Sequence, residues 1–101
     1  MSAYAIIHVS VTDPDKYRRY TAATPDIVAR HGGRFLVRGG PAVTMEGPAE
    51  TRRVVVIEFP SVQHARDFYT SPDYQHAKTF RDGAAVMHFV IVEGCLDATA
   101  R

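Results

Sequence analysis

The sequence predicts an α+β fold, because four apolar runs with period-two character alternate with two helical segments. The runs span residues 4–11, 34–38, 53–59 and 84–93, and the helical segments follow the first and third runs. This βαββαβ order is typical of a ferredoxin-like, four-stranded antiparallel sheet with helices on one face. The 101 residues, 46% of them hydrophobic, suffice for one core. We therefore expect a single domain over residues 1–95 and a flexible tail over 96–101.

Capping residues indicate where the helices begin. Asp13 can cap the first helix, and Pro14 suits the first helical position. Pro25 lies inside that helix and predicts a kink or a restart there. In the second crossover Ser61 predicts one helix start, and Ser71, which precedes a proline, predicts another. We therefore expect the crossover helix to be bent or split.

The apolar pattern of the strands predicts that the chain pairs with itself. The third run, RVVVIEF, is nearly continuous in β-branched residues, which is typical of a central strand. If one set of alternate residues meets the helices, the opposite set is also apolar: Ile6, Val54, Val56, Val86, Val90 and Val92. Leaving each of these exposed forgoes roughly 1.5–3 kcal/mol. We therefore expect an obligate homodimer in which two sheets pack face to face.

Composition disfavours several classes of function. The net charge of +1 comes from 12 basic and 11 acidic residues that are interleaved, so no nucleic-acid partner is expected. The absence of a long apolar run and of a leader predicts no membrane partner and a cytoplasmic location. Cys95 is the only cysteine, which rules out an internal disulfide. The five histidines lack metal-ligand spacing, and no nucleotide-binding glycine motif occurs, so neither metal nor cofactor is expected.

Three polar residues interrupt the apolar strands on the face away from the helices: His8, Glu58 and His88. They would cluster if the first and third strands were parallel neighbours and the fourth ran antiparallel beside the first. Desolvation raises the pKa of a carboxyl group and a cationic partner lowers it, so Glu58 could be a base, an acid or a structural ion. His8 beside it could shuttle protons near neutral pH, or it could simply be hydrogen-bonded in an interface.

The Arg38-Gly39-Gly40 loop is a second candidate, for binding. Glycines let backbone amides approach a ligand, and a guanidinium grips a carboxylate or an enolate with two hydrogen bonds. The alternative is a turn that needs positive φ, with Arg38 paired to Glu46 or to Glu58 of either subunit. Within one hairpin Arg38 and Glu58 should lie at opposite strand ends, so we expect no direct contact in one chain.

The second crossover contributes three further candidate binding residues, Ser71, Tyr74 and Arg81. Arg81 should lie near the start of the last strand, close to His8 and His88, and His88 itself is a candidate binding residue. The alternative roles of the three crossover residues are capping, packing and surface charge.

Several segments together carry a family resemblance: GGRFLVRGGP, the MEG after it, VVVIEFPS, A-x-x-F-Y-x-S-P-D-Y-Q and the final VEG. Over residues 4–94 the chain resembles the bacterial family called domain of unknown function 1330. The resemblance implies a ferredoxin-like, dimeric α+β barrel with pockets between sheet and helices. The family signature falls on Gly32, Gly33, Arg38, Gly39, Gly40, Glu46, Gly47, Glu58, Phe59, Ser71, Tyr74 and Arg81.

The resemblance does not supply a reaction, because the wider superfamily is diverse. It includes cofactor-independent monooxygenases, small isomerases and decarboxylases, haem-degrading enzymes and ligand-sensing domains. The haem branch is disfavoured, because its members use a tryptophan and an asparagine that this chain lacks, although His76 lies on an expected helix.

Two hypotheses of function follow. The first is a cofactor-independent enzyme acting on a small organic acid or carbonyl compound by acid–base chemistry. Arg38 would hold the anion, Glu58 and His8 would move the proton, and Tyr74 and Arg81 would polarise an oxygen. The second is a non-catalytic dimeric module that binds a small ligand or only stabilises an assembly, with Glu58 and Arg38 as interface ions.

Overall fold

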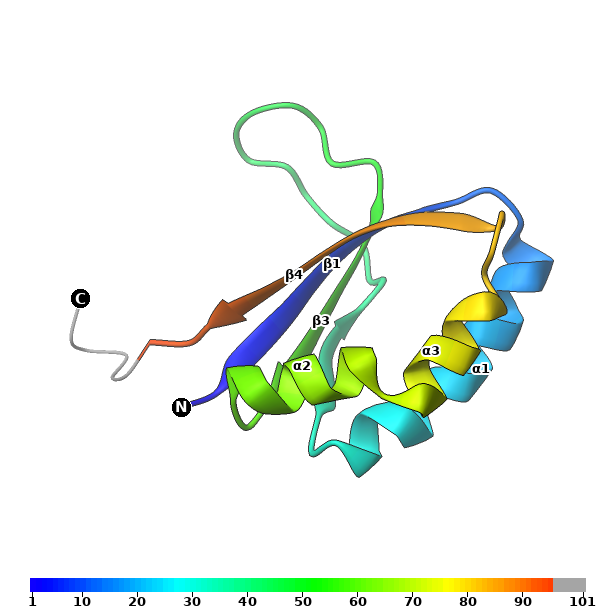
Figure 1. Cartoon of the computed structure of the whole chain (residues 1–101). Helices are drawn as coiled ribbons and strands as arrows, with labels where there is room; N and C mark the ends of the chain where they lie inside the picture. Colours follow the sequence, from blue (N-terminus) through cyan, green and yellow to red (C-terminus); the bar gives the residue numbers. More distant parts are fainter. Residues whose placement is uncertain (96–101) are drawn as a thin grey trace.

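The computed structural model describes residues 1–95, and the tail expected at 96–101 lies outside them. Four strands form one sheet, and three helices cover one face of it (Figure 1). The elements in chain order are β1 (Ala3–Val11), α1 (Pro14–Arg30), β2 (Arg34–Arg38), β3 (Arg53–Phe59), α2 (Val62–Thr70), α3 (Pro72–Thr79) and β4 (Ala85–Glu93). The predicted ferredoxin-like βαββαβ order is confirmed, with the second crossover helix in two pieces.

The sheet has the strand order β2-β3-β1-β4, and every neighbouring pair is antiparallel. The central position predicted for β3 is confirmed. Parallel pairing of β1 with β3, which would have clustered His8 and Glu58, is wrong. In the antiparallel register Tyr4 pairs with Glu58 and His8 pairs with Val54, which precedes Glu58 by four residues in β3.

The helices begin at the capping residues. The side chain of Asp13 accepts from the backbone N–H of Lys16 at 3.1 Å, and Pro14 is the first residue of α1. Of the two alternatives predicted at Pro25, a kink or a restart, the restart is wrong, because α1 continues through Pro25 to Arg30, and the kink stays a prediction. The predicted split of the crossover helix is confirmed, since Ser71 lies between α2 and α3 and is the cap residue of both.

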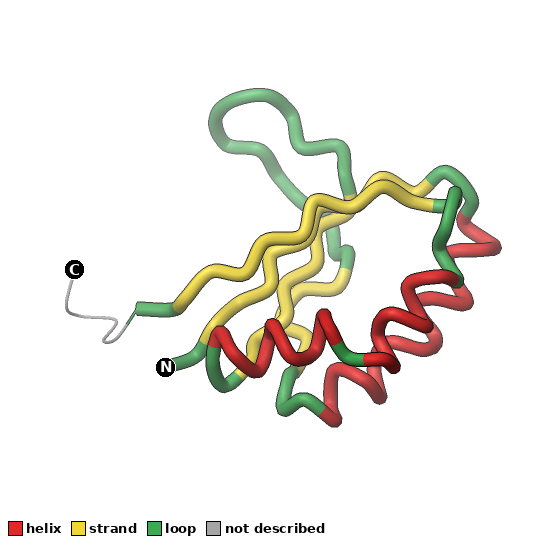
Figure 2. Tube along the Cα trace, in the orientation of Figure 1, coloured by secondary structure: helices red, strands yellow, loops and turns green. Residues whose placement is uncertain are grey.

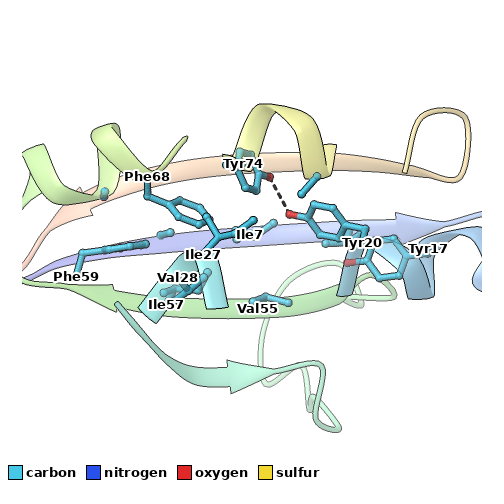
Figure 3. Close-up of a cluster of buried hydrophobic side chains, with 14 residues drawn as sticks. Ile7, Tyr17, Tyr20, Ile27, Val28, Val55, Ile57, Phe59, Phe68 and Tyr74 are labelled. Carbon is cyan, nitrogen blue, oxygen red and sulfur yellow. Dashed lines mark hydrogen bonds between the residues drawn. The ribbon is translucent and has the colours of Figure 1, made fainter. Parts of the chain in front are cut away.

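The core lies between the sheet and the helices (Figure 3). The strands contribute alternate residues, and the helices contribute large aromatic side chains. The largest fully buried side chains are Val9, Val28, Phe59, Phe68 and Tyr74. Phe68 from α2 packs against Phe59 and Tyr74 with ring centroids 5.2 and 4.6 Å apart.

The opposite side of the sheet carries no helix (Figure 2). We call this side the open face; it comprises Tyr4, Ile6, His8, Val54, Val56, Glu58, Val86, His88, Val90 and Val92. Val86, Val90 and Val92 are 71, 37 and 44% exposed. The apolar second face predicted from strand parity is therefore present and uncovered in the single chain.

Residues 39–52, which we call the arm, connect β2 to β3 and stand away from the sheet on the side of the open face (Figure 1). Val43 and Met45 at the arm's outer part are 81 and 90% exposed. Among residues 1–95 none of the helices has the length and apolarity needed to cross a membrane.

Candidate functional site

An interior cavity lies between the sheet and α1. Its walls are mostly apolar and aromatic, including Ile7, Val55, Phe35 and Phe68. The empty space is about 410 Å³ when the part open to solvent is included, but the centre of a water molecule can reach only about 30 Å³ of it. The closed cavity thus has room for little more than a water molecule, and a larger guest requires its mouth to open. The polar side chains that line it are Tyr17, Tyr20, Thr21, Thr24, Arg38 and Arg53.

Arg38 lies at the mouth of this cavity. It is the last residue of β2, and its pairing with Val55 places it on the helix-facing side of the sheet. Its guanidinium donates from Nη2 to the backbone carbonyl of Thr21 at 2.9 Å and lies 4.5 Å from the ring centroid of Phe35. Arg38 is exposed, so its head group borders both the cavity and solvent.

Pro25 explains why a helix carbonyl is available to Arg38. In an α-helix the carbonyl of Thr21 would accept from the N–H of the residue four positions later, which is Pro25. Proline has no N–H, so that carbonyl keeps its acceptor capacity. Arg38 donates to this carbonyl, so the missing N–H of Pro25 allows the helix to hold the guanidinium at the mouth.

Arg53, the first residue of β3, is the second cation of the mouth. It donates from Nη2 to the backbone carbonyl of Arg38 at 3.4 Å, while its Nε is buried without a partner. The chain at Gly39 gives it room: a Cβ there would lie 2.1 Å from Nη1 of Arg53, and the φ of Gly39 is +75°. A Cβ at Gly40 would meet nothing within 4 Å. The lack of a side chain at Gly39 thus leaves space for the guanidinium of Arg53. At Gly40 a side chain would meet no neighbour, so glycine is not required there for space.

The mouth is electropositive and continues into a surface groove. The centre of a water molecule can reach about 340 Å³ of this open groove. The groove shares Tyr17, Thr21 and Arg53 with the cavity and adds Arg18. Among the described residues neither Arg38 nor Arg53 forms an ion pair with a carboxylate. Two guanidinium groups without counter-ions at an apolar cavity favour an anionic ligand.

Tyr20, which lines the cavity, points its hydroxyl toward that of the buried Tyr74 (Figure 3). Their hydroxyl oxygens are 2.8 Å apart, and Tyr74 is fully buried. Burial, reinforced by the neighbouring Tyr74, raises the pKa of Tyr20 far above its ordinary value, so Tyr20 is a neutral phenol at physiological pH. The guanidinium carbon of Arg81 lies 5.2 Å from the ring centroid of Tyr20.

The expected position of Arg81 close to His8 and His88 is wrong. Arg81 follows α3 and packs against Tyr20 of α1 on the helix side, whereas both histidines belong to the open face. The sheet separates them. Ser71 has the capping role: it donates to the carbonyl of Phe68 at 2.8 Å and accepts from the N–H of Tyr74 at 3.1 Å.

Glu58 lies at one end of the open face, outside the cavity, where two neighbouring side chains donate hydrogen bonds to it. Its carboxylate accepts from Arg34 Nε at 2.7 Å and from the Tyr4 hydroxyl at 3.2 Å, and its side chain is 21% exposed. The hydrogen bond from Arg34 is the main cause that lowers the pKa of Glu58. Glu58 is therefore ionised at neutral pH, and in this chain its partner is Arg34, not Arg38.

We expect Glu58→Gln to lower the melting temperature slightly at neutral pH and to leave ligand binding unchanged. Arg34 is 73% exposed, so solvent screens the pair. A lowered carboxyl pKa stabilises the fold above the ordinary pKa of glutamate, and this stabilisation is lost as the pH falls through the folded value. Thermal unfolding at neutral and acidic pH should therefore show a difference between wild type and variant that shrinks in acid. A difference that grows in acid would contradict this assignment.

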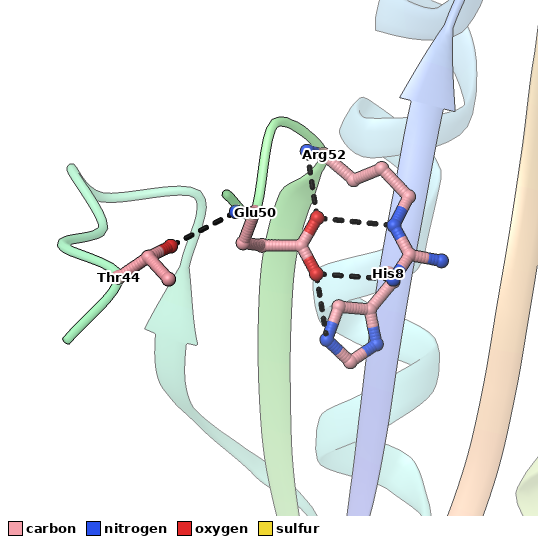
Figure 4. Close-up of polar contacts among 4 residues, drawn as sticks. All are labelled: His8, Thr44, Glu50 and Arg52. Atoms are coloured by element: carbon pink, nitrogen blue, oxygen red, sulfur yellow. Dashed lines mark hydrogen bonds and ion pairs between the residues drawn. The ribbon is translucent and has the colours of Figure 1, made fainter. Parts of the chain in front are cut away.

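His8 and His88 face each other across β1 and β4, with ring centroids 6.3 Å apart. His8 Nε2 lies 3.4 Å from Glu50, which also binds Arg52, and Thr44 accepts from the backbone N–H of Glu50 at 2.9 Å (Figure 4). Hydrogen bonds from Arg52 lower the pKa of Glu50 to about 2. These contacts tie the returning end of the arm to the open face.

No group of three or more potential metal ligands occurs among residues 1–95. His8 has one carboxylate neighbour, Glu50, and this carboxylate is also bound by Arg52. Glu50 could not be found from the sequence, because it lies in an arm whose fold no periodicity predicts.

The family model for a domain of unknown function, DUF1330, matches residues 2–95. The chain belongs to the DUF1330 family. No curated protein matches this member of DUF1330.

Solved structures similar to this DUF1330 chain share its fold. A protein of unknown function from Rhodopseudomonas palustris is 22% identical, with a TM-score of 0.72 over 95% of this chain and 84% of that one. SnoaB, a cofactor-independent oxygenase from Streptomyces nogalater, is 13% identical, with a TM-score of 0.66 over 97% of each. A dimeric ferredoxin-like protein of unknown function from Jannaschia is 14% identical, with a TM-score of 0.62 over 93% and 100%.

Proposed function

We propose that this protein binds a small organic anion with an apolar body in the cavity between the sheet and α1, and converts it without a cofactor. The observation that carries the proposal is the pair of guanidinium groups, Arg38 and Arg53, that lie without carboxylate partners at the mouth of an apolar, aromatic cavity. Ligand sites of this kind combine apolar walls with a few placed polar groups.

The lining favours stabilisation of negative charge over proton abstraction. It contains guanidinium, phenol and threonine groups, and no carboxylate or imidazole. Glu58 and His8, the proton carriers of the sequence-based hypothesis, belong to the open face, so we assign them no role in the cavity. We propose that the arginines and a neutral tyrosine stabilise an enolate or a similar oxyanion of the ligand, and that water at the open mouth of the cavity takes the proton that is released.

SnoaB, which has the same fold and is described as a cofactor-independent oxygenase, supports conversion without a cofactor. Entry of a substrate requires the mouth to widen, because the closed cavity is small. Arg38 is suited to this movement, since its head group is exposed and is held by one hydrogen bond and one ring contact. An anion that binds the Arg38 guanidinium in place of the Thr21 carbonyl would open the cavity as it binds.

Binding of benzoate, compared with its neutral analogue benzamide, tests the proposal. We expect calorimetry to show that benzoate binds and that Arg38→Gln weakens its binding by at least tenfold, the size of a charge-assisted hydrogen bond of about 1.5–3 kcal/mol. Benzamide should bind the wild type more weakly than benzoate does.

Arg34→Gln is the matched control, because Arg34 belongs to the same strand as Arg38 and the charge change is equal. Arg34 lies outside the cavity, beside Glu58. An equal loss in both variants would show only a general charge effect, and that result, or no benzoate binding at all, would overturn the proposal.

We further propose that the protein is a homodimer formed through the open face. Its exposed valines and the dimeric state described for the Jannaschia protein support this assembly. The same observations favour the second hypothesis, a dimeric module that binds its ligand without converting it. Turnover of a bound anion would separate the two. A cytoplasmic location stays a prediction from the sequence.

A further inference from the structure

We propose that the ligand carries a second oxygen, which accepts a hydrogen bond from Tyr20 in the cavity lining, and that Tyr74 and Arg81 position this donor. The inference rests on the proposed function and specifies its substrate: an organic acid with a carbonyl, enolate or hydroxyl oxygen remote from the carboxylate. Arg38 and Arg53 would hold one end and Tyr20 the other.

Counting the hydrogen bonds of Tyr20 and Tyr74 shows that one of their two hydroxyl protons has no acceptor among the described residues. The two hydroxyls have two O–H groups, and the bond between them at 2.8 Å uses one. No other acceptor among the described residues is bonded to either hydroxyl. Tyr74 is fully buried, whereas Tyr20 lines the cavity. When Tyr74 donates to Tyr20, the remaining proton of Tyr20 is free to point into the cavity.

Arg81 gives this end of the cavity a positive charge. Only 9% of its surface is exposed, its Nε has no hydrogen-bond partner, and within residues 1–95 it has no carboxylate partner. A buried cation without a counter-ion is costly to the fold. Beside Tyr20 and Tyr74 it strengthens the phenols as donors, and an oxyanion accepting from Tyr20 would supply the missing negative charge.

A pair of probes that differ in one oxygen tests the inference: benzoate and para-hydroxybenzoate, measured by calorimetry on the whole chain. We expect the wild type to prefer para-hydroxybenzoate by about three- to tenfold, the size of one hydrogen bond. Tyr20→Phe should bring the ratio of the two affinities close to one. Tyr74→Phe should reduce the ratio in part, because Tyr20 keeps its hydroxyl but loses its positioning partner.

Tyr69→Phe is the matched control and should keep the preference. Tyr69 packs against Tyr74 in the same aromatic cluster, with ring centroids 5.1 Å apart, but it lines a different surface groove. A wild type that binds both probes equally, or a Tyr20→Phe variant that keeps the preference, would overturn this inference and leave the proposed function standing. No binding of benzoate would instead overturn the proposed function and this inference together.

Discussion

We expect Val90→Lys to convert the protein from a homodimer to a monomer at micromolar concentration. Val90 lies on the open face near the middle of the edge strand β4, paired with Ile6 of β1, and is 37% exposed in the single chain. In a two-fold dimer each substitution occurs twice, so two ammonium groups would be placed in one apolar interface. Each unpaired buried charge costs several kcal/mol. The dimer dissociation constant should therefore rise at least ~100-fold.

Size-exclusion chromatography with light scattering gives the subunit count, and circular dichroism reports whether the separated chain stays folded. Ala22→Lys is the control, because Ala22 is exposed on α1, on the other side of the molecule. It should leave the assembly unchanged. A Val90→Lys variant that remains a dimer would show that the subunits do not associate through the open face, and a wild type that is monomeric at this concentration would overturn the dimer itself.

Much of the fold is predictable from the sequence because local signals agree with one another. Strand parity separates the buried Ile7 and Ile57 from the exposed Val86, and this alternation needs no knowledge of the partner strand. Ser61 and Ser71 start α2 and α3 through hydrogen bonds to residues three positions ahead. Such signals are short-range, so one sequence is enough to find them.

The candidate site was less predictable, because strand direction and side-chain layer are long-range properties. Antiparallel pairing of β1 with β3 separates His8 from Glu58, although both belong to the open face as parity predicts. No motif in the sequence distinguishes Tyr20 from the other residues of its helix. Its hydroxyl became a candidate donor only once α3 placed Tyr74 opposite it.

Pro25 illustrates a signal that was visible but interpreted incompletely. The missing N–H was expected to disturb the helix, and instead α1 continues while the carbonyl of Thr21 bonds to Arg38 on the neighbouring strand. A helix defect can therefore indicate a tertiary contact as well as a kink. Finding the partner required the sheet register that places Arg38 on the helix side.

The largest effect on stability should come from Phe68→Ala, with a loss of about 3–5 kcal/mol. Phe68 is 1% exposed and packs against Phe59 and Tyr74, so its removal opens a hole where α2 meets the sheet. This loss is a large part of the ~5–15 kcal/mol that stabilises a typical domain. Urea denaturation should show a lower midpoint with an unchanged slope, and a slope that changes instead would indicate an altered denatured state or an intermediate.

The same substitution should change the ligand size that the cavity accepts, because Phe68 is part of its wall. If the wall does not collapse, Phe68→Ala should bind 2-naphthoate, which the wild type should bind more weakly than benzoate. Phe80→Ala is the matched control: Phe80 is half-buried against Arg19 and His76, outside the cavity lining, so we expect a smaller loss of stability and no change in preference. An equal loss of stability in both variants would show that Phe68 is not central to the core. If a crystal structure of the variant shows that the wall has not collapsed, an unchanged ligand preference would show that anions bind elsewhere.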